Sequence, residues 1–245
     1  FGNNTFVVVG NAGVILTTQD GITWEQQVQG DPNEPNLRGI SFGNDIFVAV
    51  GDGGTILTSP DGTTWTEEDS GTTNRAFQGV TYGNNTFVTV GQTGAVYTSP
   101  DGSTWTNREV QYFSVNLNEV TYGNDTFVAV GDDGNVITSP AGITWAVQTP
   151  VYGQQNLNGV YYANDTFITV GTAENILTSP NGSTWTVQRS GATQNLKGLA
   201  YGNSKFVTVG ASGTILTSPD ETTSSAMVSK VTLSGLDTSS GVYFE

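Results

Sequence analysis

Residues 116–150 read NLNEVTYGNDTFVAVGDDGNVITSPAGITWAVQTP, and this stretch decides the fold. Asn116 to Tyr122 is predicted as a short strand, Thr126 to Val130 as a second and Asn135 to Thr138 as a third. The intervening sequences are rich in Gly, Asn, Asp and Pro, and Gly and Asn tolerate the positive φ of tight hairpins. A fourth strand begins at Thr144-Trp145 and becomes polar after the tryptophan, which suits an edge facing water. The stretch therefore predicts a small sheet of four antiparallel strands.

The same pattern recurs along the whole chain. The five tryptophans are spaced by 41, 40, 40 and 40 residues, and each follows a threonine. An aromatic residue before Gly-Asn or Ala-Asn recurs six times in the same period. A repeat of about 40 residues with four short strands is typical of a propeller blade. We therefore expect an all-β, six-bladed β-propeller that forms one domain over residues 1–245, with its tryptophans largely buried. They are Trp24, Trp65, Trp105, Trp145 and Trp185.

The two ends of the chain are expected to complete one blade together. The chain starts just before the second strand of a unit, so the first unit lacks its innermost strand. Gly241-Val242-Tyr243-Phe244 matches Gly159-Val160-Tyr161-Tyr162 of the fifth unit. We expect residues 236–245 to supply the missing strand, which would close the ring and hide both sheet edges. The sixth unit is degenerate: a serine replaces its tryptophan, and Val228 to Leu233 is the candidate for its outer strand.

The turns before the tryptophans resemble a known repeat. Ser59-Pro60-Asp61-Gly62-Thr63-Thr64-Trp65 and the equivalent segments 99–105 and 18–24 are similar to the Asp-box, or bacterial neuraminidase repeat, in a variant one residue shorter. Asn181 and Ala141 replace the Asp in two units. The resemblance implies a peripheral turn whose Asp accepts backbone N–H groups and whose Trp plugs the blade. Families with similar repeats include sialidases, sortilin-type receptors, xyloglucan hydrolases and photosystem II assembly factors, and fold alone does not choose among them.

Composition excludes several classes of function. The chain has no Cys and no His, which removes thiol nucleophiles, Ser-His-Asp triads and the usual zinc and haem sites. Its net charge of −15 argues against nucleic acid and anionic membranes as partners. No apolar run is long enough to span a bilayer, and the Asp-rich turns lack the spacing of a calcium loop. We therefore expect neither cofactor nor metal, and no membrane insertion.

Departures from the repeat are the best candidates for a site. One position of the innermost strand, two residues before an apolar one, is polar in five units and is expected to line or rim the central channel. Two carboxylates replace glycines of other units, Glu119 in an innermost strand and Glu174 in a turn. Such a pair is the minimum for glycoside hydrolysis, although neither has a supporting motif. The five polar residues are Arg38, Gln78, Asn118, Asn158 and Lys197.

The connections between units vary most and are predicted to share one face with the turns between second and third strands. We call it the loop face. Asp132 and Asp133 lie in one of those turns, and Tyr112, Phe113 and Tyr152 lie in the connections. Aromatic side chains among Asn and Gln suit the binding of a sugar or a protein, although they also pack against blades. These residues complete the set of candidate ligand-binding positions.

The sequence favours a non-catalytic recognition or adhesion module that binds a glycan or a protein through the loop face. Its low lysine content and its many Thr and Asn residues favour an extracellular or cell-surface location. One alternative is a rigid subunit of a larger surface assembly that contains other copies or domains. A second is a glycoside hydrolase of sialidase-like architecture, although the Arg-Ile-Pro signature of sialidases is absent.

Overall fold

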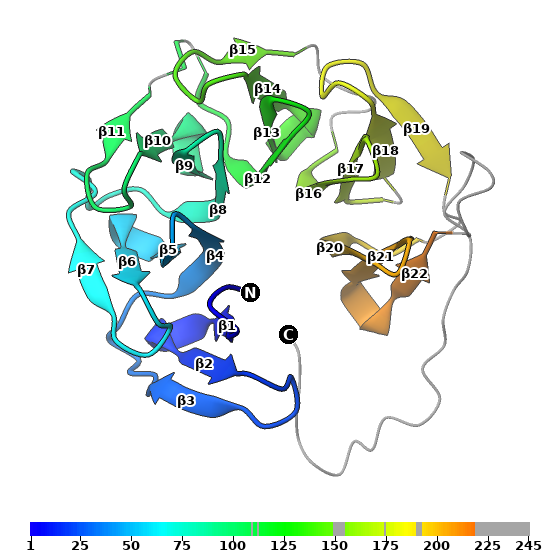
Figure 1. Cartoon of the computed structure of the whole chain (residues 1–245). Helices are drawn as coiled ribbons and strands as arrows, with labels where there is room; N and C mark the ends of the chain where they lie inside the picture. Colours follow the sequence, from blue (N-terminus) through cyan, green and yellow to red (C-terminus); the bar gives the residue numbers. More distant parts are fainter. Residues whose placement is uncertain (109, 112, 149–154, 174, 190–192, 219–245) are drawn as a thin grey trace.

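A computed structural model describes residues 1–108, 110–111, 113–148, 155–173, 175–189 and 193–218. Six antiparallel sheets are arranged in a ring, one after another along the chain (Figure 1). Each sheet is one blade, and the blades are numbered in chain order. The described residues contain strands and short 3₁₀ turns but no α-helix, so the predicted all-β, six-bladed propeller is confirmed.

The first three blades contain eleven strands and three 3₁₀ turns. Blade 1 has β1 (Phe6–Val9), η1 (Asn11–Gly13), β2 (Ile15–Thr18) and β3 (Glu25–Val28); blade 2 has β4 (Leu37–Gly43), β5 (Ile46–Gly51), η2 (Asp52–Gly54), β6 (Ile56–Ser59) and β7 (Thr66–Glu68); blade 3 has β8 (Phe77–Gly83), β9 (Thr86–Gly91), η3 (Gln92–Gly94), β10 (Val96–Ser99) and β11 (Thr106–Asn107).

The other three blades follow the same order. Blade 4 has β12 (Leu117–Gly123), β13 (Thr126–Gly131), η4 (Asp132–Gly134), β14 (Val136–Ser139) and β15 (Ala146–Val147); blade 5 has β16 (Leu157–Ala163), β17 (Thr166–Gly171), β18 (Asn175–Ser179) and β19 (Thr186–Arg189); blade 6 has β20 (Leu196–Gly202), β21 (Lys205–Gly210), η5 (Ala211–Gly213) and β22 (Ile215–Thr217). The proposed closing strand 236–245 and the candidate outer strand 228–233 lie outside the described residues.

The hairpin turns form as the sequence predicts. In blade 4, Asn124 and Asp125 both have positive φ, 44° and 53°, between β12 and β13. Asn, Asp and Ser occupy these two positions in the other blades, because their short polar side chains tolerate the left-handed conformation. Strand limits differ from the prediction by one or two residues; the outer strand β15, for example, begins at Ala146 rather than Thr144.

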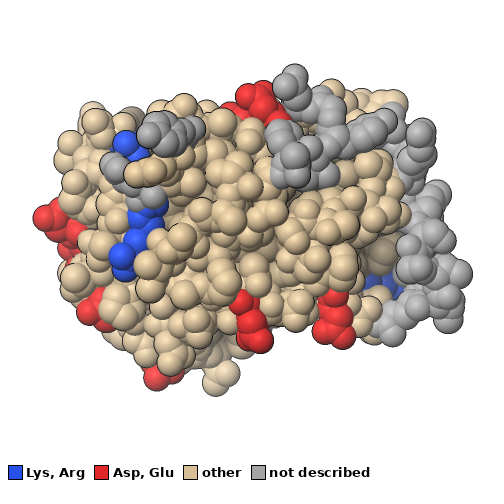
Figure 2. Space-filling model, turned by 90° about the horizontal axis from the view of Figure 1, so that it is seen from above, with Lys and Arg blue, Asp and Glu red and all other residues tan. Residues whose placement is uncertain are grey.

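The hydrophobic core lies between neighbouring blades. The second strands of blades 2 to 5 are buried on both faces; β13, whose second residue is Phe127, has five consecutive buried residues. Val128 packs with Leu157 of blade 5, while Phe127 packs with Val88 of blade 3. Blade 4 thus buries one face against blade 3 and the other against blade 5. The outer strands are short, and those of blades 1 to 3 are largely polar. Figure 2 shows one side of the molecule with acidic side chains scattered over a largely uncharged surface.

The tryptophans are not largely buried, so that prediction is wrong. Trp24 is 42% exposed, and the other four are half-buried. The Trp145 indole N–H donates to the carbonyl oxygen of Gly142 at 2.9 Å, and its ring centroid lies 6.4 Å from that of Phe127. The indole therefore covers the phenylalanine from the rim of the blade, and the phenylalanine fills its centre. A residue just before the outermost strand has neighbours on one side only, which explains its exposure.

The turns before the tryptophans are held by side-chain hydrogen bonds. The Ser59 hydroxyl accepts the Gly62 N–H at 2.8 Å, and Asp61 Oδ1 accepts the N–H groups of Thr64 and Thr63 at 2.9 and 2.8 Å. These backbone hydrogen bonds lower the pKa of Asp61 to about 2. Asp20, Asp101 and Asn181 make the same contacts in their blades. The aspartates therefore act in turn formation, as expected.

Blade 4 provides a natural test of this turn. Ala141 has no acceptor to offer, and the buried Ser139 hydroxyl has no hydrogen-bond partner among the described residues. We expect Ala141→Asp to raise the free energy of unfolding at neutral pH by about 1 kcal/mol, since it adds side-chain acceptors for backbone N–H groups. The lowered pKa of such an aspartate means that this gain is present above about pH 4 and lost towards about pH 2. Urea unfolding at both pH values measures it.

The matched control for this substitution is Ala141→Asn, which copies the turn of Asn181. It should stabilise the protein without the pH dependence, because the amide does not titrate. An aspartate variant no more stable than the parent at neutral pH would contradict the assigned role of the carboxylate.

Candidate functional site

Where the structure describes the connections, they lie beside the turns as predicted. The 3₁₀ turns that follow the second strands lie beside the connections that lead to the next blade. A Cβ added to Gly54 of η2 would lie 2.1 Å from the carbonyl oxygen of Thr72, and one added to Gly94 of η3 would lie 2.5 Å from that of Phe113. Turns and connections are thus in direct contact, and together they form one surface of the ring.

A recurring asparagine joins the turns of blades 1, 3, 4 and 5 to the next blade. Asn156, just before β16, accepts the backbone N–H of Asp133 in η4 at 3.1 Å. Asp133 has a φ of 54°, which turns its N–H towards blade 5. We call this contact the asparagine latch. It was missed in the sequence, although an Asn recurs immediately before the first apolar residue of the innermost strands. The latches are Asn36 to Ala12, Asn116 to Thr93, Asn156 to Asp133 and Asn195 to Ala173.

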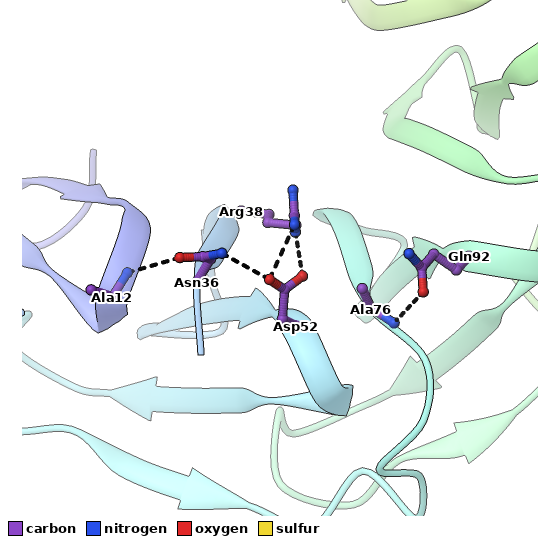
Figure 3. A network of polar contacts seen from close by, with 6 residues as sticks. All are labelled: Ala12, Asn36, Arg38, Asp52, Ala76 and Gln92. Carbon is purple, nitrogen blue, oxygen red and sulfur yellow. Dashed lines mark hydrogen bonds and ion pairs between the residues drawn. The ribbon is translucent and has the colours of Figure 1, made fainter. Parts of the chain in front are cut away.

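Arg38 is held in place by its own blade. Its guanidinium binds Asp52 through Nε at 2.5 Å and through Nη2 at 3.1 Å (Figure 3). Asn36 Nδ2 donates to the same carboxylate at 3.0 Å while its Oδ1 forms the latch to Ala12. The hydrogen bond from Arg38 lowers the pKa of Asp52, with a smaller contribution from Asn36. A loop-face cation is therefore fixed by a network that also spans two blades.

Blade 4 repeats this network without the cation. Asn118 Nδ2 donates to Asp132 at 3.1 Å and to the carbonyl oxygen of Leu157 at 2.9 Å. Asn158 Nδ2 donates in the same way to the carbonyl oxygen of Leu196 at 2.7 Å. Both amides therefore bridge neighbouring blades. Because their N–H groups are already bonded within the ring, a structural role is favoured over ligand binding. Each sits at a β-bulge of its innermost strand, which turns the polar side chain out of the ladder.

The other candidates divide by exposure. Lys197 is exposed and Gln78 half-buried, and within the described part of the chain neither side chain has a hydrogen-bond or ion-pair partner. Asp133 is exposed on η4. Phe113 is partly buried and packs against the core of blades 3 and 4, which favours a packing role for this aromatic residue. Tyr112, Tyr152 and Glu174 lie outside the described residues.

Glu119 is the departure with the clearest physical consequence. The equivalent residues in blades 2, 3, 5 and 6 are glycines, and neighbouring innermost strands lie close together there. Glu119 Oε1 lies against Gly79 of blade 3 and accepts the backbone N–H of Val120 at 3.0 Å. The side chain keeps part of its surface accessible, yet it lies deep among the innermost strands. Burial therefore raises the pKa of Glu119 to about 7, against the lowering effect of the Val120 N–H.

The raised pKa predicts a pH-dependent cost of carrying Glu119. Below about pH 4.5 the carboxyl is protonated in both the folded and the unfolded protein and costs nothing electrostatically. As pH rises towards about 7, only the unfolded chain ionises fully, so stability falls and then stays low. We expect Glu119→Gln to raise the free energy of unfolding by roughly 2 kcal/mol at pH 8 and by almost nothing at pH 4. Urea unfolding of both proteins across this range measures the difference, and a pH-independent difference would refute the assignment.

Neither the carboxylate pair considered for hydrolysis nor a metal site is established. Glu174 lies outside the described residues, so its distance from Glu119 is undefined. Among the residues that the structure describes, no group of three or more His, Cys, Asp or Glu side chains is arranged to hold a metal ion. No helix in this part of the chain has the length and apolar character needed to cross a membrane.

Comparisons with known proteins agree with the architecture. Residues 36–153, just under half of the chain, match the family model described as the DUF6242 beta propeller domain. No curated protein sequence matches the chain. Among solved structures, YCF48 bound to a D1 peptide is 20% identical with a TM-score of 0.68, covering 87% of this chain and 74% of that one.

Two further structures are similar at lower identity. A nidogen/laminin complex is 11% identical with a TM-score of 0.66, covering 87% of this chain and 88% of that one. A catalytically inactive virginiamycin B lyase from Staphylococcus aureus with quinupristin is 11% identical with a TM-score of 0.71, covering 85% and 78%. At these identities the likeness is one of fold. The chain is thus a six-bladed β-propeller that shares a matching segment with the DUF6242 beta propeller domain.

Proposed function

We propose that this chain is a non-catalytic recognition module that binds a protein segment through its loop face. The observation that carries the proposal is that the framework is constant from blade to blade while the connections on the loop face vary. Latches such as Asn156 to Asp133 fix the turns of neighbouring blades, while the connections beside those turns differ in length and sequence from blade to blade. A rigid frame that presents variable loops is the usual arrangement of a binding surface.

Two further observations support a protein ligand. Solved structures of similar fold are a YCF48 bound to a D1 peptide and a nidogen/laminin complex, so the fold serves protein binding in other chains. Many of the polar side chains on this loop face are already used within the ring, as Asn118 and Arg38 are. A partner must therefore be recognised through the remaining exposed groups, Lys197 and Asp133 among them. The Thr- and Asn-rich composition leads us to propose an extracellular or cell-surface location.

The proposal is tested by binding assays with variants of the two faces. The full chain is screened against a peptide array, a glycan array and extracts of the native surface. The loop-face variant combines Asp133→Asn with Lys197→Gln, and the matched control combines Asp45→Asn with Asp165→Asn in hairpin turns on the opposite face. The turn position that Asp45 and Asp165 occupy carries Asn in other blades, as Asn4 and Asn85, so folding should be preserved.

We expect the loop-face variant to lose at least tenfold in affinity for a bound peptide or protein, with an unchanged melting temperature, and the control to bind normally. If binding is lost only when the control face or the blade edges are mutated, the rigid-subunit alternative is favoured instead. A glycan hit alone would change the ligand class. Turnover of a glycoside that disappears in Glu119→Gln would overturn the non-catalytic proposal.

A further inference from the structure

Blade 2 contains a polar pocket of about 370 Å³ on the loop face. Its floor is the turn after β5, and its walls are the end of the outer strand β7 and the connection to blade 3. A volume of this size lies at the lower end of the range for ligand pockets and accommodates one long side chain. The lining residues are Gly53, Gly54, Thr55, Glu67, Glu68, Asp69, Ser70, Thr72 and Thr73.

The equivalent places in two other blades hold larger side chains. In blade 3, Phe113 packs over Gly94, and in blade 1, Glu34 lies 3.2 Å from a Cβ added to Gly13. In blade 2 the atoms that approach Gly54 are the backbone carbonyl of Thr72 and the hydroxyl of Ser70, and both side chains are short. Gly53 and Gly54 both have positive φ and add no side chains. The pocket of blade 2 is therefore open because of its local sequence rather than the general geometry of a blade.

One residue of this pocket is a hydrogen-bond acceptor where the other blades have a donor. Three residues after the tryptophan, four blades carry a hydrogen-bond donor that binds a threonine hydroxyl of the third strand: Gln27, Arg108, Gln148 and Gln188. Blade 2 has Glu68 there, and the Thr58 hydroxyl donates to its Oε1 at 2.7 Å. Glu67 and Asp69 flank it, so this strand end carries three successive carboxylates. This difference was not predicted from the sequence. It becomes visible when the repeat units are aligned on their tryptophans, which places Glu68 at the same position as Gln27, Arg108, Gln148 and Gln188.

Few donors are available to these carboxylates. Asp69 accepts the N–H of Gly71 at 2.8 Å, and the Ser70 hydroxyl donates to the Thr72 carbonyl oxygen at 3.0 Å. Within the described residues no donor contacts the Glu67 carboxylate, and no basic side chain lines the pocket. The lining thus presents carboxylate and carbonyl acceptors together, which suits a ligand rich in N–H donors and carrying positive charge.

We propose that this pocket binds a basic side chain, an arginine guanidinium, of the protein partner. The proposal rests on the proposed function, because it identifies the chemistry by which the loop face recognises a protein segment. A guanidinium presents five N–H donors in a plane, which suits a lining that offers several carboxylate and carbonyl acceptors. The net charge of −15 adds a long-range attraction for such a ligand.

The test follows the backbone amide signals of the ¹⁵N-labelled full chain by NMR during titration with N-acetylarginine methylamide. The comparison probe is N-acetylcitrulline methylamide, which has nearly the same shape but no charge. We expect saturable shifts at Gly53, Gly54 and Thr72 with the arginine probe, weaker at high salt, and at least tenfold weaker binding of citrulline.

The variant Glu67→Gln/Glu68→Gln removes both charges, and Gln at position 68 copies the residue found in blades 1, 4 and 5. It should bind the arginine probe at least tenfold more weakly than the parent. The charge-matched control Asp45→Asn/Asp125→Asn, in hairpin turns on the opposite face, should bind it normally. Equal binding by the two variants, equal binding of citrulline, or the same shifts produced by Ca²⁺ would overturn the proposal.

This experiment distinguishes a failure of the pocket assignment from a failure of the recognition function. If a protein partner binds the loop face but is indifferent to Glu67→Gln/Glu68→Gln, the pocket assignment fails and the recognition function stands. If the arginine probe binds the pocket while no protein or peptide engages the loop face, the recognition function fails and the pocket remains a site for a guanidinium.

Discussion

Replacing Phe127 by alanine should lower the free energy of unfolding by about 3–5 kcal/mol, the usual range for a fully buried phenylalanine. Phe127 has no accessible surface and lies at the centre of blade 4, where it contacts Val88 of the preceding blade and the ring of Trp145. Its removal leaves a cavity between two blades that short β-strands cannot close by shifting. Chemical unfolding followed by tryptophan fluorescence measures the loss.

The matched comparison is Trp145→Ala in the same blade. The indole is larger, but it is half-buried at the rim, and its hydrogen bond to Gly142 is close to solvent. We therefore expect a smaller loss than for Phe127→Ala, although the removed side chain is bigger. A tryptophan variant less stable than the phenylalanine variant would show that the indole, and not the phenyl ring, is the centre of the blade.

The comparison of these two residues also shows what the sequence could establish. The 40-residue period and the six aromatic-Gly/Ala-Asn motifs predict the number of blades, because they are visible in the sequence itself. The Gly-Asn turns predict the hairpins, because a hairpin turn depends on a few consecutive residues. The depth of a side chain depends on what the neighbouring blade places beside it. Trp145 marks the repeat more visibly than Phe127 does, yet the phenylalanine is the buried one.

The dependence on the neighbouring blade also explains why the candidate site could be predicted only in part. Asn118 stood out as a polar departure on an innermost strand, but its partner is the carbonyl oxygen of Leu157, one blade away. The asparagine latches likewise join residues 22 to 24 positions apart in sequence. Such pairs become visible only when the ring is assembled. Glu119 could be identified in advance, since a carboxylate in place of glycine is a change in composition and needs no knowledge of the partner.

The boundary between blades 1 and 6 differs from the other blade boundaries. Phe6 and Val8 of β1 are 42% and 46% exposed, whereas Phe47 and Ala49 at the same positions of blade 2 are buried. On the other side, Val209 of β21 is 48% exposed, whereas its counterpart Val170 is fully buried. Apolar surface that every other blade buries is therefore accessible on both sides of this one boundary, and it needs a cover.

Residues 236–245 are the segment that the sequence assigns to this cover, because Gly241–Phe244 matches an innermost strand and blade 1 has none among the described residues. We expect deletion of 236–245 to abolish cooperative unfolding or to cause aggregation, since a ring fold depends on every boundary and an open one exposes two apolar faces. The measurement combines urea unfolding with size-exclusion chromatography and light scattering.

A substitution and a rescue make this test specific. Val242→Asp/Phe244→Asp in the full chain should reproduce the defect, because it places charges on the strand that is meant to be buried, while Ser239→Asp/Ser240→Asp just before it should be tolerated. A synthetic peptide of residues 236–245 added to the truncated protein should restore the lost stability in proportion to its concentration, as expected for a ligand that binds only the folded state. A truncated chain that unfolds cooperatively at the parental midpoint and stays monomeric would show that the ring does not depend on this strand, and the apolar faces of β1 and β21 would then need a different occupant.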